Sequence, residues 1–423
     1  MIPLALAEVE ALSLGELRPG ASETIQRVVS DSRVAAPGDL FVALNTGVRY
    51  VDEAAARGAA TLVPSDQQEA LFTLARLVRS RSRARVVAIV GSVGKTTTKD
   101  ILGALAAPHA RTVWAERSAN NEIGLPLTVL RLEPDTEVLV TEMGMRGVGQ
   151  IAELCEVARP EVAVVTHVGP EHLELLGSIE RVAEANAEAI AALPSGGTAV
   201  VPAHAPALEP FLDRRDITLR RFDRADVELE GARGRFRIDG RELELELPFT
   251  QRHLAWNTLA ALHAYAALGL PLERAAEGVG AIRLSPWRGE ELPLPGGGVV
   301  VNDAYNANPD SMRAALEDLV ERAGGRRTLA VLGEMAELGA ASESYHRSIG
   351  ELASALGIAV VGVGEAARAY APVAWAPDAE SALAVLREVV RPGDAILVKA
   401  SRVVGLEGIA EEIANIAGAW SRS

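Results

Sequence analysis

Short apolar runs alternate with longer helical patterns through the middle of the chain. Three of these runs are Val86–Val90, Val138–Thr141 and Val162–Thr166. Because uninterrupted apolar runs suit strands buried on both faces, and helices separate them, they predict parallel strands with crossover connections. A glycine turn follows the first run, and a helix is expected from about Lys95. The pattern predicts a mostly parallel sheet covered by helices.

Two later stretches follow different patterns. Residues 226–249 alternate charged and apolar positions, with glycines at the expected turns, which predicts a small antiparallel part. Beyond residue 285 apolar runs again alternate with helices, which predicts a second α/β unit of Rossmann-like type. Its runs are Val299–Val301, Thr328–Leu332, Ile358–Val361 and Ala395–Val398.

Two segments, one polar and basic and the other containing prolines and glycines, predict the domain boundaries. The polar, basic residues 76–85 indicate the end of a helix and a linker, and residues 271–289 contain two prolines and several glycines. We therefore predict an α/β protein of three domains. They are an N-terminal domain over 1–83, a central domain over 84–285 and a C-terminal domain over 286–423.

Composition and charge exclude several classes of protein. Of the 423 residues, 48% are hydrophobic and the formal net charge is −15, so a nucleic-acid coat protein is not expected. The single cysteine, Cys155, excludes an intrachain disulfide framework. Neither an apolar run of membrane-spanning length nor a basic secretory leader is visible. We expect a cytoplasmic protein without nucleic-acid partners or membrane spans.

Lysine is rare in this chain. It occurs only at Lys95, Lys99 and Lys399, against 39 arginines. This bias could reflect genome composition or a hot habitat, and the sequence does not separate the two. Each lysine therefore calls for an explanation.

The run after the first strand carries the clearest chemistry. It reads Gly91-Ser92-Val93-Gly94-Lys95-Thr96-Thr97. Glycines let backbone N–H groups approach phosphate oxygens, the lysine can reach the β- and γ-phosphates, and the Thr96 hydroxyl can bind Mg²⁺. Ile89 stands where the full Walker pattern has its first glycine, so the loop is a variant. An ordinary strand–helix turn is the alternative, but the sequence favours ATP binding.

This loop resembles the ATP loop of the Mur ligase superfamily, and further segments resemble the same family across all three predicted domains. These segments are Asn120–Pro126, Tyr305–Met312, Leu332–Gly339 with His346, Lys399–Arg402, and Asp31–Arg33 followed by Pro37–Leu44.

The resemblance implies a reaction and an assignment of the domains. The motifs are similar to those of ligases that add D-Ala-D-Ala to UDP-N-acetylmuramoyl-tripeptide in peptidoglycan synthesis, with ATP and Mg²⁺ as cofactors. The N-terminal domain would bind the UDP-muramoyl peptide, the central domain ATP, and the C-terminal domain the incoming dipeptide. A monomer is expected.

The resemblance also implies roles for individual residues. The catalytic set would be Lys95, Glu142, His172 and Arg288, with Thr96, Glu142 and His172 as metal ligands. Nucleotide contacts would come from Gly91, Ser92, Val93, Gly94, Lys95, Thr96, Thr97, His253, Asn257, Arg288, Asp303 and Asn306. Substrate contacts would come from Ser30, Asp31, Ser32, Arg33, Asn120, Asn121, Asn306, Asn308, Lys399 and Arg402.

One departure from the family bears on the metal site. The family has a lysine, carbamylated to give an anionic ligand for a second Mg²⁺, where this chain has Asn186. Glu184 and Glu188 lie two residues away on either side, roughly 200° around the helix, so neither replaces it without rearrangement. Three consequences of this asparagine stay open. The second metal could bind more weakly, a carboxylate from elsewhere in the chain could replace the lysine, or the protein could be catalytically impaired.

Two alternative functions follow from these departures. One is a nucleotide-binding pseudoenzyme that acts as a partner or regulatory module. The other is an amide ligase that uses a different acceptor. Turnover that requires both the UDP-tripeptide and D-Ala-D-Ala would exclude both alternatives.

Overall fold

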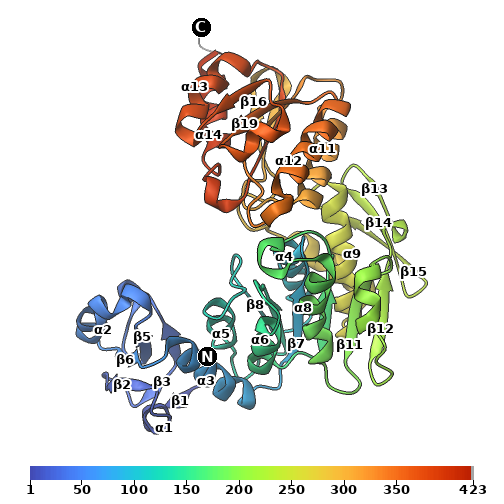
Figure 1. The fold of residues 1–423 in the computed structure, drawn as a ribbon. Coiled ribbons are helices and arrows are strands. Elements are labelled where there is room, and N and C mark those ends of the chain that lie inside the picture. The colour runs from blue at the N-terminus through green and yellow to red at the C-terminus, as the bar shows by residue number, and fades with distance from the viewer. Residues whose placement is uncertain (421–423) are drawn as a thin grey trace. The chain divides into compact units, whose positions relative to one another are not determined.

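The computed structural model describes residues 1–420, with side chains described to residue 416 (Figure 1). Its contacts divide the chain into two compact units, which are described separately. The first unit comprises Met1–Thr166, Ala185–Pro248 and Asn257–Arg283, and the second comprises His167–Glu184, Phe249–Trp256 and the chain from Leu284 onwards. The division into three domains at residues 83 and 285 stays a prediction.

The N-terminal part of the first unit contains a four-stranded mixed sheet. Its strand order is β2 (Gly15–Arg18), β6 (Ala60–Pro64), β5 (Asp39–Val42) and β4 (Arg27–Val29), of which only β2 runs antiparallel to its neighbour. A two-stranded sheet pairs β1 (Leu4–Ala5) with β3 (Thr24–Ile25). The helices here are α1 (Leu6–Ala11), α2 (Val51–Ala56) and α3 (Gln67–Arg81).

The central sheet of the first unit has six parallel strands, as the apolar runs predict. Its order is β12 (Thr218–Phe222), β11 (Thr198–Pro202), β10 (Val162–Val165), β7 (Arg85–Val90), β9 (Val138–Glu142) and β8 (Thr112–Trp114). Strand β7 lies between β9 and β10, so the strand order reverses beside it. In open α/β sheets, ligands bind at the carboxyl ends of the strands at such a reversal.

Helices connect these strands, and a small antiparallel sheet follows them. The connecting helices include α4 (Lys95–Ala106), α5 (Gly124–Val129), α6 (Gln150–Ala158) and α8 (Ile179–Ala191), whereas α9 (Arg252–Ala267) and α10 (Ala276–Val279) follow the antiparallel sheet along the chain. Strands β13 (Val227–Glu230), β14 (Arg233–Ile238) and β15 (Arg241–Glu246) pair antiparallel. Exposed and buried residues alternate along β14, so the predicted hairpins are confirmed.

The second unit contains the second predicted α/β sheet. Its order is β16 (Glu290–Leu294), β17 (Gly298–Asn302), β21 (Ala395–Lys399), β18 (Thr328–Leu332), β19 (Ala359–Val363) and β20 (Ala374–Ala376). All neighbours are parallel except β16 and β17. Its helices are α7 (Leu173–Leu176), α11 (Pro309–Ala323), α12 (Ser342–Ala355), α13 (Ala379–Val389) and α14 (Ile409–Trp420).

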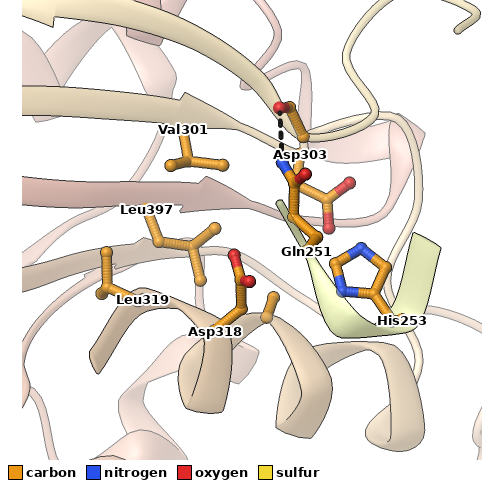
Figure 2. Close-up of a pocket in the computed structure, with 9 residues that line it drawn as sticks. Gln251, His253, Val301, Asp303, Asp318, Leu319 and Leu397 are labelled. Carbon is orange, nitrogen blue, oxygen red and sulfur yellow. Dashed lines mark hydrogen bonds between the residues drawn. The ribbon is translucent and has the colours of Figure 1, made fainter. Parts of the chain in front are cut away.

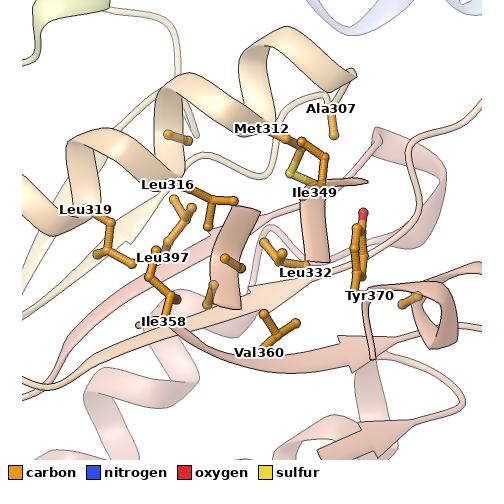
Figure 3. Close-up of a cluster of buried hydrophobic side chains, with 14 of the residues drawn as sticks. Ala307, Met312, Leu316, Leu319, Leu332, Ile349, Ile358, Val360, Tyr370 and Leu397 are labelled. Atoms are coloured by element: carbon orange, nitrogen blue, oxygen red, sulfur yellow. The ribbon is translucent and has the colours of Figure 1, made fainter. Parts of the chain in front are cut away.

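Apolar side chains fill the space between this sheet and its helices. Met312 and Leu316 of α11 and Ile349 of α12 pack with Leu332 and Leu397 of the strands (Figure 3). A second buried cluster contains residues of α13 and α14 together with strand residues. The α/β architecture predicted from the sequence is confirmed. Among the described residues, no helix is long and apolar enough to cross a membrane.

His263 of α9 gives the first unit a predictable response to pH. The side chain is 5% exposed, and neither ring nitrogen has a hydrogen-bond partner among the described residues. Burial lowers the pKa of His263, so the folded state keeps the ring neutral. The unfolded chain takes up a proton below about pH 6.5, and stability is therefore present above that pH and is lost on acidification.

Replacing His263 by leucine is expected to reduce the loss of stability between pH 7 and pH 5. The wild-type chain loses up to about 1.4 kcal/mol per pH unit from this group once the unfolded state is protonated. Urea unfolding across this range measures the effect. The control compares the free energy of unfolding of the wild-type and leucine proteins at pH 8, where the histidine ring is neutral in both the folded and the unfolded state. An unchanged slope with pH in the leucine variant would contradict this assignment.

Candidate active site

The glycine loop lies between β7 and α4, where the strand order reverses. Gly91 and Gly94 have φ angles of +128° and +85°, which favour glycine, and a Cβ on Gly94 would lie 2.3 Å from Oδ1 of Asn257. The Lys95 ammonium donates to the Gly91 carbonyl. The Thr166 hydroxyl, at the end of β10, donates to the Val93 carbonyl at 2.6 Å. The loop is thus closed by its own lysine and supported by a threonine that the sequence reasoning missed.

Glu142 ends the strand beside β7 and is 1% exposed. Its Oε1 accepts a hydrogen bond of 2.8 Å from the Asn120 amide, and its Oε2 is buried without a hydrogen-bond partner among the described residues. A buried carboxylate oxygen without a donor is costly unless a cation or proton satisfies it. Carboxylate and hydroxyl oxygens are the ligands that Mg²⁺ prefers, so Glu142 and Thr96 fit such an ion.

The two asparagines of the predicted substrate loop have partners within the protein. Asn120 contacts the Glu142 carboxylate, as described above. The Asn121 side chain accepts hydrogen bonds from the N–H groups of Ile123 and Gly124 at the start of α5. In this structure Asn121 therefore caps a helix.

His172, the third predicted metal ligand, belongs to the second unit. Its Nδ1 pairs with the Glu337 carboxylate, and both residues have positive φ angles, 50° and 62°. Metal-binding histidines usually bond a carboxylate through the ring nitrogen that does not bind the metal. This pairing leaves Nε2 as the candidate ligand atom. Glu337 lies inside a motif of the resemblance, Leu332–Gly339, but no role was predicted for it.

No group of three or more His, Cys, Asp or Glu side chains within residues 1–420 is arranged to hold a metal by itself. Mg²⁺ at nucleotide sites is usually bound by one or two protein oxygens together with phosphates and water. The Glu142 and Thr96 oxygens agree with a site of that kind.

The position of the missing lysine is buried. Asn186 lies on α8 and is 1% exposed. Glu188 accepts from the N–H groups of Gly149 and Ala152 and so caps α6, whereas Glu184 pairs with Arg181 at 3.1 Å. Neither carboxylate takes the place of the missing lysine, as the helix geometry predicts.

A small cavity of the second unit is lined by two of the predicted nucleotide residues, His253 and Asp303 (Figure 2). His253, Gln251, Asp303 and Asp318 line it together with apolar side chains. Burial lowers the pKa of His253, although both aspartates act in the opposite direction. Asn257, the other residue of the predicted pair, belongs to the first unit and faces Gly94.

Lys399 lies beside this cavity, is 2% exposed, and has an ammonium group that is hydrogen-bonded within the protein. Its ammonium donates to Asp303 Oδ2 at 2.6 Å and to the Asn306 carbonyl at 2.8 Å. It therefore holds the segment 303–306 in place. The Asn306 side chain is exposed, whereas Asn308 caps α11 by accepting from Ser311 N–H at 2.9 Å.

Two arginines of the second unit lie over aromatic rings. Arg288 lies 4.0 Å from the Tyr305 ring centre, and Arg402 lies 4.3 Å from that of Trp287. Trp287 has a φ of +60°, in the left-handed region that favours glycine. Arg402 pairs with Glu407 at 3.4 Å and is half exposed, so its guanidinium, unlike the Lys399 ammonium, is accessible to an anion.

The predicted sugar-binding residues form a surface turn. Asp31 pairs with Arg33 at 2.7 Å, and this guanidinium lowers the pKa of Asp31 to about 2. Ser30 is exposed, whereas Ser32 is buried and donates to Glu53. Asp31 and Arg33 are therefore charged and accessible.

Models of two protein-family domains match this chain. The Mur ligase middle domain matches residues 89–265, and the Mur ligase glutamate ligase domain matches residues 287–402. The chain belongs to the Mur ligase family, and the resemblance seen in its motifs is confirmed.

Within that family, the chain is similar to ligases of one particular name. The UDP-N-acetylmuramoyl-tripeptide–D-alanyl-D-alanine ligase of Escherichia coli is 32% identical, with 97% of this chain and 98% of the relative covered. The ligase of the same name from Bacillus subtilis is 32% identical over 92% and 93%.

The fold of this chain is also similar to solved structures of MurF ligases. MurF from Acinetobacter baumannii has a TM-score of 0.85 and 26% identity, over 98% of this chain and 99% of that one. MurF ligase from Thermotoga maritima, solved in complex with ADP, has a TM-score of 0.81 and 28% identity, over 94% and 98%.

Proposed function

We propose that this protein is an ADP-forming ligase that joins D-Ala-D-Ala to UDP-N-acetylmuramoyl-tripeptide during peptidoglycan precursor synthesis in the cytoplasm. The observation that carries the proposal is the site at the end of β7. There a glycine loop with Lys95 lies beside the buried, partly unsatisfied Glu142 carboxylate, in a chain that matches ligases of this name almost end to end.

The chemistry requires an activated carboxylate. An oxygen of the tripeptide carboxylate attacks the γ-phosphorus of ATP, the bond to the ADP oxygen breaks, and an acyl phosphate forms. The amine of D-Ala-D-Ala then attacks the acyl carbon, inorganic phosphate leaves, and an amide remains. Phosphoryl transfer needs alignment and charge neutralisation more than covalent help from the protein.

The residues of the first unit fit the phosphoryl-transfer step. The loop N–H groups and the Lys95 ammonium would bind the phosphates, and α4 adds positive potential at its start. The Thr96 and Glu142 oxygens would hold Mg²⁺, which supplies charge neutralisation when bound. Arg288, which belongs to the second unit, is proposed as a further cation for the nucleotide.

Residues of the second unit fit the nucleotide and the acceptor. Asp303 would accept hydrogen bonds from the ribose hydroxyls and is held in place by Lys399. Arg402 is the better candidate for the dipeptide carboxylate, because a guanidinium binds a carboxylate bidentately and Arg402 is half exposed, whereas Lys399 is buried.

Replacing Arg402 by alanine is expected to raise the KM for D-Ala-D-Ala by about tenfold, because one charged hydrogen-bonding group is lost. The KM for ATP should change little. Arg368→Ala is the matched control, because that arginine also lies over a tryptophan ring, Trp375 at 3.5 Å, outside the proposed site. An unchanged KM for the dipeptide in the Arg402 variant would remove this residue from the acceptor site.

Asn186 leads to a second expectation, because asparagine cannot be carbamylated. ADP release by the wild-type protein is expected to be the same in CO₂-depleted and in bicarbonate-supplemented buffer. Asn186→Lys places an amine at this position, and Asn186→Gln is the matched control without one. A bicarbonate requirement in the wild-type protein would show that another amine is carbamylated.

The test of the whole proposal is ADP release by the purified protein with ATP and Mg²⁺, with the UDP-tripeptide and D-Ala-D-Ala added singly and together. Turnover only with both substrates is expected. If the folded protein binds ADP but shows no turnover with both, a nucleotide-binding pseudoenzyme becomes the better description. Turnover with another acceptor in a substrate panel would indicate a different amide ligase. We expect a monomer, which light scattering coupled to size-exclusion chromatography would measure.

A further inference from the structure

Lys99 is a buried cation that the proposed mechanism leaves without a role. The residue lies one turn after Lys95 on α4 and is 0% exposed. Its ammonium donates to the Ala115 carbonyl at 2.5 Å and to the Arg117 carbonyl at 2.6 Å, and it pairs with Asp100 at 2.8 Å. An ammonium has three donors, and these three partners account for all of them.

The two carbonyls belong to one loop, residues 115–120. Arg117 in this loop has a φ of +53°, an unfavourable conformation for a residue with a side chain. Burial of a charged ammonium is costly unless its partners are held in place, so the lysine and the conformation of the loop support each other. Lys99 therefore fixes the loop at the two carbonyls on either side of residue 116.

The far end of the same loop contacts both predicted metal ligands of the first unit. The Ser118 hydroxyl lies 2.9 Å from that of Thr96, and the Asn120 amide donates to Glu142 at 2.8 Å. The Asn120 carbonyl also accepts from Gly144 N–H at 2.8 Å. One short loop thus joins the buried lysine to the two oxygens proposed to bind Mg²⁺.

We infer that Lys99 is a positioning residue for the metal–nucleotide site, which it serves by fixing the loop that orients Thr96 and Glu142. The inference rests on the proposed nucleotide function of this site. An arginine would not serve in its place, because the partners converge on one point and a guanidinium is larger, planar and donates in a fork. This requirement explains why a lysine persists here in a chain with 39 arginines.

The test measures how strongly Mg²⁺ tightens ADP binding. Calorimetric titration with ADP, in Mg²⁺ and in EDTA, gives the ratio of the two affinities for each variant. The first variant is Lys99→Met combined with Asp100→Asn, which avoids leaving a buried carboxylate alone. The second is Ser118→Ala, which removes the contact with Thr96 and leaves the buried charges intact.

In both variants the ratio is expected to fall by about tenfold or more, the usual effect of losing a residue that orients metal ligands. ADP binding in EDTA should change much less. Leu105→Ala is the matched control, because it removes buried apolar volume from α4 near the contact with Gly278. It should lower stability and leave the ratio intact.

The outcomes separate this inference from the proposed function. A wild-type ratio in both Lys99 and Ser118 variants would overturn the inference, even if the ligase activity is established. If the Lys99 variant does not fold, the Ser118 variant decides alone. A wild-type protein whose ADP affinity does not respond to Mg²⁺ would overturn the proposed metal site and this inference with it.

Discussion

Replacing Lys95 by methionine is expected to lower kcat/KM for ATP by about a thousandfold. The variant keeps the length and the apolar stem of the side chain and removes only the charge, at the point where the transferred phosphoryl group must be neutralised. Loss of one such donor from a preorganised site costs about a hundred- to a thousandfold in rate. The ammonium now bonded to the Gly91 carbonyl is the only lysine amine of the loop, so no neighbouring lysine replaces it.

The experiment compares steady-state ADP release with the affinity for ADP. Turnover should fall far more than ADP affinity, because the lysine acts on the β- and γ-phosphates and ADP lacks the latter. Arg111→Met is the matched control, since it removes a surface cation of the same unit that pairs with Glu133 at 2.6 Å. Turnover of the Lys95 variant within a few-fold of wild type would exclude the proposed phosphate role.

Glu142→Gln is expected to lower kcat by about a hundredfold and to raise the Mg²⁺ concentration needed for half-maximal rate, since a metal ligand contributes several kcal/mol to charge stabilisation. The amide keeps the volume of the side chain and an oxygen for the bond from Asn120. The free energy of unfolding should be maintained or rise, because the buried charge with an unsatisfied oxygen is removed. Lower activity without lower stability is the signature of a functional residue.

Rate measurements over a series of Mg²⁺ concentrations, with urea unfolding of the same samples, test this prediction. Glu188→Gln is the control, because this carboxylate of the same unit caps α6. It should lower stability and leave the Mg²⁺ requirement unchanged. If the two variants behaved alike, Glu142 would have only a structural role.

The parts of the site that follow from local sequence were predictable. The conformation of the phosphate loop depends on two glycines, a strand before it and a helix after it, and all of these are visible within about a dozen residues of one chain segment. The same holds for the sheets, because uninterrupted apolar runs and alternating runs have different burial requirements. The position of Glu142 followed from its place at the end of a strand.

The partners of individual polar side chains were not predictable in this way. Asn121 and Asn308 belong to motifs expected to contact substrate, which stays a prediction, and the motifs did not show that these side chains bond N–H groups at the start of a helix. The sequence shows a lysine at 399 without its partner Asp303, which is 96 residues away. Such pairings depend on tertiary packing, which a local motif does not encode.

The pair His253 and Asn257 illustrates the same limit. Their spacing of four residues places them on one helical face, which is correct for α9. Yet His253 lines the cavity of the second unit, and Asn257 faces Gly94 in the first. Periodicity specifies a face of a helix and leaves open which neighbours that face meets.

The distribution of the three lysines determines which lysine side chain reacts with acylating reagents. Lys99 and Lys399 are buried and bonded, so Lys95 is the only lysine side chain with partial solvent access. An acylating dye or cross-linker that modifies a lysine therefore modifies the phosphate loop, and bound ADP should protect it. Labelling and surface immobilisation of this protein consequently require chemistry directed at groups other than lysine amines.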